Sequence, residues 1–320
     1  MNQSYCLSAD IGGTSIKLAV ISLDGIIVKK WEIPTDKQDQ GINIPKDIHE
    51  AFENELTKMD VHNDQILGIG AGAPGFINTE TGFIYEAVNI GWKNFNLGEQ
   101  LQELSGFPVW VDNDANLAAL GENWLGAGEG SDYLIAVTLG TGVGGGIIVN
   151  GQIDSGANGT AAEIGHMTVV PNGGAPCNCG KTGCLETEAS ATGIVRKVRE
   201  AISDYPTSSL KDKIQNESIT SKDVFDAGKQ GDQLAKSVLN DVIDTLGLAI
   251  ANLAIAINPE KIVIGGGVSN AGDQLLHPLM ETFYKYALPR TAEACNFGMA
   301  KLGNDAGVIG GAYLVKQNQK

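Results

Sequence analysis

Two stretches of the chain repeat one pattern, LSADIGGTSIKLAVISLDGIIV at residues 7–28 and DYLIAVTLGTGVGGGIIVNGQI at residues 132–153. Each combines an apolar strand, a sharp turn of Gly and Thr, a second strand, and an Asp-Gly or Asn-Gly hairpin. The chain has 320 residues, a length typical of about two domains. Two copies of one supersecondary unit in such a chain predict an internal duplication.

Strands alternate with helices along the rest of the chain. Apolar side chains recur at helical spacing in residues 45–59, and residues 66–75 form an apolar strand that ends in a Gly/Pro loop. A strand continues into a helix across residues 108–122. This alternation predicts an α/β architecture. The C-terminal half adds a strand at residues 261–269, helices at about 186–202, 232–257 and 305–316, and a polar surface segment at about 204–230.

The charge balance excludes one class of partner. The chain has 22 basic and 38 acidic residues, a net charge of −16, whereas a nucleic-acid binder needs a basic face to neutralise phosphates. The start of the chain lacks the basic and long apolar regions of a secretory signal. The most apolar run, residues 246–258, is shorter than the roughly 18–20 residues that span a bilayer. We therefore expect a cytoplasmic protein with neither nucleic-acid nor membrane partners.

The two glycine-rich hairpins are candidate phosphate sites. Residues 70–75 and 140–145 both match GxGxxG, but a strand rather than a helix is expected after each, which disfavours a dinucleotide site. GxxxxGK[ST] does not occur, so a P-loop is excluded. Free N–H groups and a Thr hydroxyl at such hairpins hold phosphate oxygens. The residues concerned are Gly12, Gly13, Thr14, Thr141 and Gly142.

Two charged residues of the first hairpin extend this hypothesis. Asp10 is placed to hold Mg²⁺ through water, because Mg²⁺ usually keeps much of its hydration shell. Lys17 is placed to face phosphate. The alternative is that both hairpins are tight turns with ordinary turn glycines. The occurrence of two matched copies favours the phosphate interpretation.

A cysteine cluster indicates a metal site. The stretch CNCGKTGCLE, residues 177–186, holds three of the five cysteines, a pattern unlike a disulfide framework. Cys177, Cys179 and Cys184 supply three thiolates, and tetrahedral Zn²⁺ needs a fourth ligand. His166, eleven residues before Cys177, completes a closed, structural Cys₃His site. The alternative is a set of buried free cysteines beside a core histidine.

With these motifs assembled, the sequence resembles the ROK family of sugar kinases and repressors. The resemblance covers essentially the whole chain and is carried by the DIGGT hairpin, AGAPG, NDAN, GTGVGGG, EIGH, CxCGxxGCxE and GGGVS. It implies a two-domain, actin-like ATPase (ribonuclease H-like) sugar kinase fold with an interdomain cleft. The implied domains are residues 1–118 with about 304–320, and residues 119–303 with the zinc loop. The family resemblance also suggests a homodimer.

The resemblance implies roles for particular side chains. Asp114 of NDAN is the expected catalytic base, although a plain helix N-cap would satisfy the same strand–helix junction. His166 is expected to ligate zinc through one ring nitrogen and to reach the sugar through the other. The expected substrate-binding residues are Asn113, Glu163, His166, Glu186 and Gly75, and Gly266 and Gly267 of GGGVS are expected to lie against the adenosine.

Within the family, NIGWKNFNL at residues 89–97 follows the pattern of bacterial ATP-dependent glucokinases. The expected reaction is transfer of the γ-phosphate of ATP to the 6-hydroxyl of D-glucose. Kinases for fructose, mannose or N-acetylmannosamine stay open, as does polyphosphate as donor. The family's repressors carry a helix-turn-helix domain ahead of the kinase-like part. Here the first hairpin starts within ten residues of Met1 and the charge is acidic, so we reject that class.

Overall fold

The computed structural model describes residues 4–319, and the chain forms two compact units. Of the described residues, unit 1 comprises 4–132, 146–162 and 301–319, and unit 2 comprises 133–145 and 163–300. The actin-like domain boundaries expected from the sequence stay a prediction, and they include residues 1–3 and 320, which lie outside the described part.

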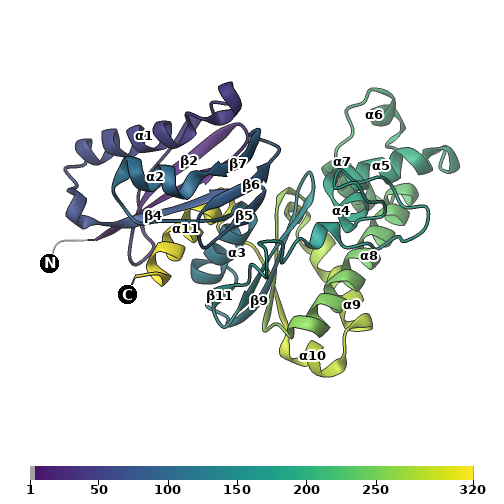
Figure 1. Cartoon of the computed structure of the whole chain (residues 1–320). Coiled ribbons are helices and arrows are strands. Elements are labelled where there is room, and N and C mark those ends of the chain that lie inside the picture. Colours follow the sequence, from purple (N-terminus) through teal and green to yellow (C-terminus); the bar gives the residue numbers. More distant parts are fainter. Residues whose placement is uncertain (1–3, 320) are drawn as a thin grey trace. The chain divides into compact units, whose positions relative to one another are not determined.

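The first sheet has the strand order β3-β2-β1-β4-β8, and its strands β2 and β4 are labelled in Figure 1. Strands β1, β2 and β3 pair antiparallel, because tight turns join them. Strands β4 and β8 continue the sheet in parallel with β1. The bounds are Tyr5–Ile11 for β1, Ser15–Ser22 for β2, Ile27–Pro34 for β3, Ile66–Ala73 for β4 and Val109–Asn113 for β8.

The second sheet has the order β11-β10-β9-β12-β13, which repeats the first strand for strand. Here too the hairpin strands β10 and β11 pair antiparallel, and β9, β12 and β13 run parallel. The repeat agrees with the internal duplication inferred from the two matching stretches. The bounds are Tyr133–Leu139 for β9, Val143–Val149 for β10, Gln152–Ile153 for β11, Lys261–Gly265 for β12 and Asn296–Met299 for β13.

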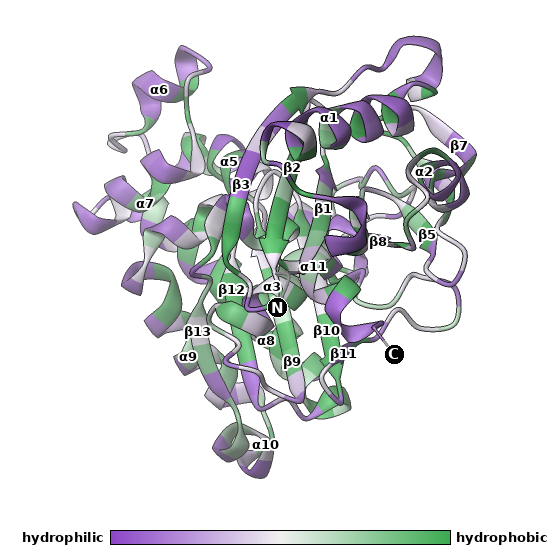
Figure 2. Ribbon diagram, turned by 90° about the vertical axis from the view of Figure 1, so that its left-hand side faces the viewer, coloured by the Kyte–Doolittle hydropathy of each residue, from purple (hydrophilic) through white to green (hydrophobic). Residues whose placement is uncertain are grey.

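A small antiparallel sheet, β5-β6-β7, lies in unit 1 between β4 and the helix α2 in the sequence. Figure 2 shows that β1, β2 and β9 are largely hydrophobic. The bounds are Phe76–Asn78 for β5, Phe83–Ala87 for β6 and Trp92–Asn96 for β7.

Helices cover both faces of the first sheet. Leu7, Ala9 and Ile11 of β1 belong to the core that includes α1 (Ile44–Lys58) and α2 (Leu97–Ser105). The alternate residue Cys6 packs with Val308 and Val315 of α11 (Ala306–Gln317). This is the period-two alternation of a strand buried on both faces.

Small residues let α11 approach the sheet closely. A Cβ on Gly70 of β4 would lie 2.0 Å from the Gly311 carbonyl oxygen, and one on Gly310 would lie 1.8 Å from the Leu117 carbonyl oxygen. Leu117 belongs to α3 (Asp114–Leu125), so α3 and α11 pack backbone against backbone. A larger side chain would therefore push α11 away from β4 at Gly70 and away from α3 at Gly310.

The expected long apolar helix is α8 (Gln233–Ile257). Its length and composition would suffice to cross a membrane, but 56% of its most apolar window is buried. It packs against α4 (Leu185–Ala189), α5 (Ala191–Ala201), α7 (Ser221–Lys229) and α9 (Asp273–Tyr286), as a core helix does. Unit 2 also contains α6 (Lys211–Gln215) and α10 (Pro289–Ala294).

Two expectations from the sequence were wrong in this unit. The helix expected at about 186–202 is two helices, because the Ser190 hydroxyl accepts a bond from the Gly193 N–H at 3.0 Å and starts α5. The polar segment at about 204–230 is not wholly on the surface, since Val224 and Phe225 of α7 are buried.

Glu122 of α3 is a buried carboxylate that holds two chain segments of unit 1. Its oxygens accept bonds from the N–H groups of Ala127 at 2.9 Å, Lys301 at 2.9 Å and Leu302 at 2.7 Å. The chain first leaves unit 1 after Asp132, returns for residues 146–162, and returns again at Lys301. Glu122 therefore hydrogen-bonds two segments that are near, in the sequence, to points where the chain passes from one unit to the other.

Replacing Glu122 with alanine should lower the free energy of unfolding by about 3 kcal/mol or more, because three N–H groups would lose their acceptor. Urea unfolding followed by circular dichroism measures this. Glu103→Ala changes an exposed glutamate and should stay within about 0.5 kcal/mol of the wild type. Equal stability of the two variants would contradict the role of Glu122.

Candidate functional site

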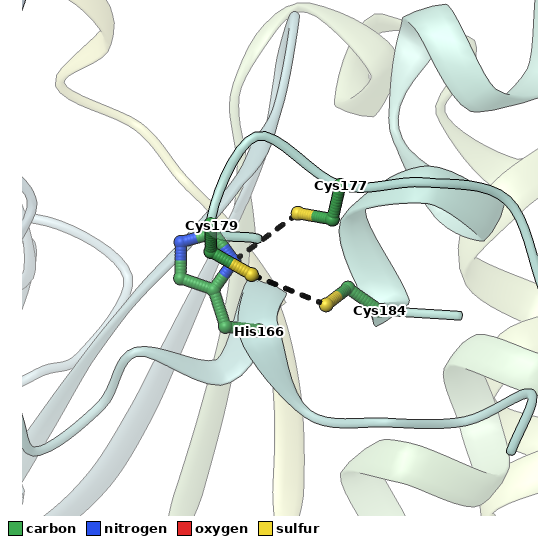
Figure 3. Close-up of side chains that lie close together, drawn as sticks. All are labelled: His166, Cys177, Cys179 and Cys184. Atoms are coloured by element: carbon green, nitrogen blue, oxygen red, sulfur yellow. Dashed lines mark hydrogen bonds between the residues drawn. The ribbon is translucent and has the colours of Figure 1, made fainter. Parts of the chain in front are cut away.

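The cysteine loop and His166 come together in unit 2 (Figure 3). His166 ends a short 3₁₀ helix, and Cys184 is the residue before α4. Their ligand atoms and those of Cys177 and Cys179 all lie within 4.8 Å of one another. Gly183 makes this loop possible, since its φ is +68° and a Cβ there would lie 1.9 Å from the Val170 carbonyl oxygen.

The donor atoms of this cluster have the spacing of a tetrahedral metal site. Cys177 Sγ lies 3.6 Å from His166 Nδ1, and Cys179 Sγ lies 3.6 Å from Cys184 Sγ. Zn–S bonds of about 2.3 Å in a tetrahedron put sulfur atoms about 3.8 Å apart. The four residues thus fit zinc in number, chemistry and distance.

Two carboxylates lie beside the cluster. Glu163 Oε2 lies 3.9 Å from His166 Nε2, the ring nitrogen that faces away from Cys177. Burial raises the pKa of Glu163, opposed by His166 and reinforced by Glu186. Glu186, in the first turn of α4, places Oε1 3.9 Å from Cys177 Sγ. The three expected sugar-binding residues of unit 2 are therefore neighbours.

The NDAN segment lies at the end of β8 in unit 1. Asn113, not Asp114, caps α3: its side-chain oxygen accepts bonds from the N–H groups of Ala115 at 2.9 Å and Asn116 at 3.4 Å. The Asn113 amide also donates to the Gly75 carbonyl at 3.3 Å. Gly75 has a φ of +98°, and a Cβ there would lie 2.0 Å from the Glu86 carbonyl oxygen. The capping role considered for Asp114 is thus filled by its neighbour.

Asp112 is a residue of this segment that we missed in the sequence. It is buried and accepts bonds from the Asn113 N–H at 2.7 Å and the Asn116 amide at 2.8 Å. Burial raises the pKa of Asp112, while these two hydrogen bonds lower it. An acidic residue at the end of the apolar strand VWVDN was the available signal.

The first hairpin brings its two charged residues together. Lys17 Nζ lies 3.2 Å from Asp10 Oδ2. The turn is closed by the Gly12 N–H bonding to Ser15, and Thr35 donates its hydroxyl to the Gly12 carbonyl at 2.7 Å. The Thr35 N–H bonds to the Thr14 carbonyl at 3.0 Å.

A second lysine reaches this hairpin. A Cβ on Gly13 would lie 3.6 Å from Lys37 Nζ, so this ammonium group adjoins the turn. Two strands, β2 and β3, separate Lys37 from the DIGGT motif, and no local pattern in the sequence indicated its position.

The second hairpin is tied to the start of α5. The Gly140 N–H bonds to the Gly142 carbonyl at 2.9 Å, and the Gly140 carbonyl accepts from the Ala191 N–H at 2.9 Å. Thr192 donates its hydroxyl to the Thr141 carbonyl at 2.8 Å. A cavity of about 600 Å³ adjoins this hairpin, and its lining includes Thr141, Thr192, Val195, Arg196, Ile219 and Ser221.

The GGGVS turn meets the same hairpin strand in unit 2. Gly266 has a φ of +83°, and a Cβ there would lie 2.5 Å from the Leu139 carbonyl oxygen. Gly267 starts a 3₁₀ helix, and its carbonyl accepts from the Asn270 amide at 3.1 Å. Only glycine fits at position 266.

Comparison with known proteins agrees with this arrangement, since residues 6–318 match the ROK family. The chain belongs to the ROK family. Among ROK proteins it is 55% identical to the glucokinase of Halalkalibacterium halodurans over 320 residues, covering 100% of this chain and 97% of that one.

Two solved ROK structures resemble this chain closely. The ROK glucokinase of Streptomyces griseus in complex with glucose and AMPPNP is 32% identical, with a TM-score of 0.76, covering 98% of this chain and 100% of that one. A ROK transcriptional regulator homologous to the Mlc protein of Escherichia coli is 28% identical, with a TM-score of 0.85, covering 99% of this chain and 78% of that one. The α/β, actin-like ROK fold expected from the sequence is confirmed.

Proposed function

We propose that this chain is an ATP-dependent glucokinase, which transfers the γ-phosphoryl group of ATP to the 6-hydroxyl of D-glucose. The main support for this proposal is the 55% identity to a glucokinase over the whole chain. The ROK structure that contains glucose and AMPPNP supports the same pair of substrates. A cytoplasmic homodimer is the expected form, and light scattering of the purified protein tests the dimer.

Asp114 is the proposed catalytic base, because phosphoryl transfer needs a carboxylate to accept the hydroxyl proton. Its position at the first residue of α3 supports this role, since Asn113 supplies the cap. Asn113 and Gly75 bind the sugar beside it. Asp10 holds Mg²⁺ through water, and this ion neutralises charge on the phosphates.

The nucleotide is bound by the two hairpins and the GGGVS turn. Lys17 and the turn of the first hairpin face the phosphates, as do Thr141 and Gly142 of the second. Gly266 and Gly267 lie against the adenosine. The cavity beside Thr141 supports this assignment, because it gives room next to the hairpin.

His166, Cys177, Cys179 and Cys184 hold a structural Zn²⁺. Its chemical contribution is to fix the loop rather than to react, because all four positions are filled by side chains. Glu163, Glu186 and the free Nε2 of His166 hydrogen-bond glucose hydroxyls. The cluster orients these groups, since His166 and the cysteine loop lie next to both carboxylates.

The fold does not separate kinases from regulators, because a ROK regulator has the higher TM-score of the two structures. Sequence identity does favour the kinase, at 55% to a glucokinase. Kinases for other hexoses are the nearest alternative, since hydroxyl-binding carboxylates suit any of them.

A coupled assay with MgATP tests the reaction and its sugar. We expect kcat/KM for glucose to exceed that for mannose, fructose and N-acetylmannosamine by about tenfold or more, because a sugar whose hydroxyls are placed differently leaves polar groups of the site unpaired. A higher kcat/KM for another sugar would replace glucose as substrate. Turnover of none of the four would overturn the kinase assignment.

A further inference from the structure

Glu186 contacts two parts of unit 2 that have different proposed ligands. Its Oε1 faces Cys177 of the metal loop at 3.9 Å. Its Oε2 accepts a hydrogen bond from the Val143 N–H at 3.1 Å. Val143 follows Gly142 directly in the second hairpin. One carboxylate therefore joins the metal loop to the hairpin that faces phosphate.

Gly142 leaves the room that this contact needs. A Cβ on Gly142 would lie 2.1 Å from Glu186 Oε2 and 3.0 Å from its carboxyl carbon. The φ of Gly142 is not in the left-handed region, so the backbone itself does not demand glycine there. The absent side chain is explained by the carboxylate that occupies its place.

The rest of the hairpin does not have this constraint. A Cβ on Gly140 would meet no atom within 4 Å, and its φ is also ordinary. Gly140 is held instead by the Ala191 N–H through its carbonyl. A methyl group would therefore displace Glu186 at position 142 but not at position 140, although both glycines belong to one turn.

We propose that Glu186 couples the sugar site to the phosphate hairpin, with Gly142 as the positioning residue that admits its carboxylate. This rests on the proposed function, in which Glu186 binds glucose and the hairpin binds ATP. A glucose hydroxyl that orients Glu186 also orients its bond to Val143, and so orders the hairpin. By linkage, nucleotide that orders the hairpin strengthens glucose binding by the same factor.

The first test is glucose binding without nucleotide, measured by isothermal titration calorimetry on the full chain. Gly142→Ala should raise the Kd for glucose by about tenfold or more, because the new methyl displaces Glu186. Gly140→Ala is the matched control and should change this Kd less than about twofold. If the hairpin affects nucleotide binding alone, both variants should bind glucose as the wild type does. That result would overturn the coupling.

A second test needs no variant. In the wild type, saturating glucose should lower the Kd for AMPPNP by about fivefold or more, within the usual range of coupling between sites. An unchanged Kd overturns the coupling even if Gly142→Ala fails to fold. Wild-type protein that binds no glucose would overturn the proposed function together with the coupling, whereas wild-type binding with normal Gly142→Ala binding overturns the coupling alone.

Discussion

Asp114→Asn should lower kcat for glucose phosphorylation by about a thousandfold, within the range supplied by a general base. The glucose Kd should change little, because asparagine has the shape of aspartate and keeps a hydrogen-bonding oxygen. The fold should also survive. The Asn113 side chain caps α3, and an asparagine oxygen at position 114 can keep the bond that Asp114 Oδ1 accepts from the Ala115 N–H at 2.9 Å.

A coupled assay and calorimetry with glucose measure these two quantities separately. Asp64→Asn makes the same chemical change at an exposed position of unit 1 and controls for charge. A variant that kept a tenth or more of the wild-type kcat would show that another group accepts the proton. Equal losses of kcat and of glucose affinity would point to a binding role for Asp114.

Cys179→Ser should release zinc and raise the KM for glucose by about tenfold or more, since altering the supports of a site typically costs 10–100-fold. Cys179 is the exposed member of the cluster, and its sulfur lies 3.6 Å from that of Cys184. Without the metal, His166 and the cysteine loop no longer share a coordinating ion that keeps them together. The free energy of unfolding should fall as well, because binding energy at a structural zinc site is folding energy.

Metal analysis, thermal unfolding and steady-state kinetics check the three effects. Cys295→Ala is the matched control, because Cys295 is a buried thiol of the same unit outside the cluster. It should keep the zinc and the KM for glucose. A Cys179→Ser protein that lacked zinc but had normal kinetics would separate the metal from the sugar site.

The features that could be predicted from the sequence are those encoded in local patterns. Gly and Thr turns between apolar strands indicated both hairpins, and thiol spacing indicated the cluster of three cysteines with His166. Asp114 came only from resemblance, since the residues alone left capping and catalysis equally open. Residue spacing could not show which of the two caps the helix. In the structure the Asn113 side chain caps α3, and the carboxylate of Asp114 lies next to it.

Long-range contacts, burial and backbone packing account for what was missed. Glu122 binds backbone groups about 180 residues away, so no local window indicates its partners. Asp112 acts on residues one and four positions later, but its burial depends on the fold around β8. The break at Ser190 follows from Gly193, where a Cβ would lie 2.5 Å from the Thr187 carbonyl oxygen. The periodicity of apolar residues continues across this break and hides it.

The position of α11 bears on how the protein is made. Residues 306–317 cover a face of the first sheet that β1, β2 and β4 form from residues 5–73. During synthesis that apolar face stays uncovered until residues 306–317 have left the ribosome, whereas residues 133–145 and 163–300 of unit 2 are complete earlier. Nascent chains that stall before α11 should therefore depend on chaperones, and loss of residues 306–317 should be as damaging as loss of the first strands.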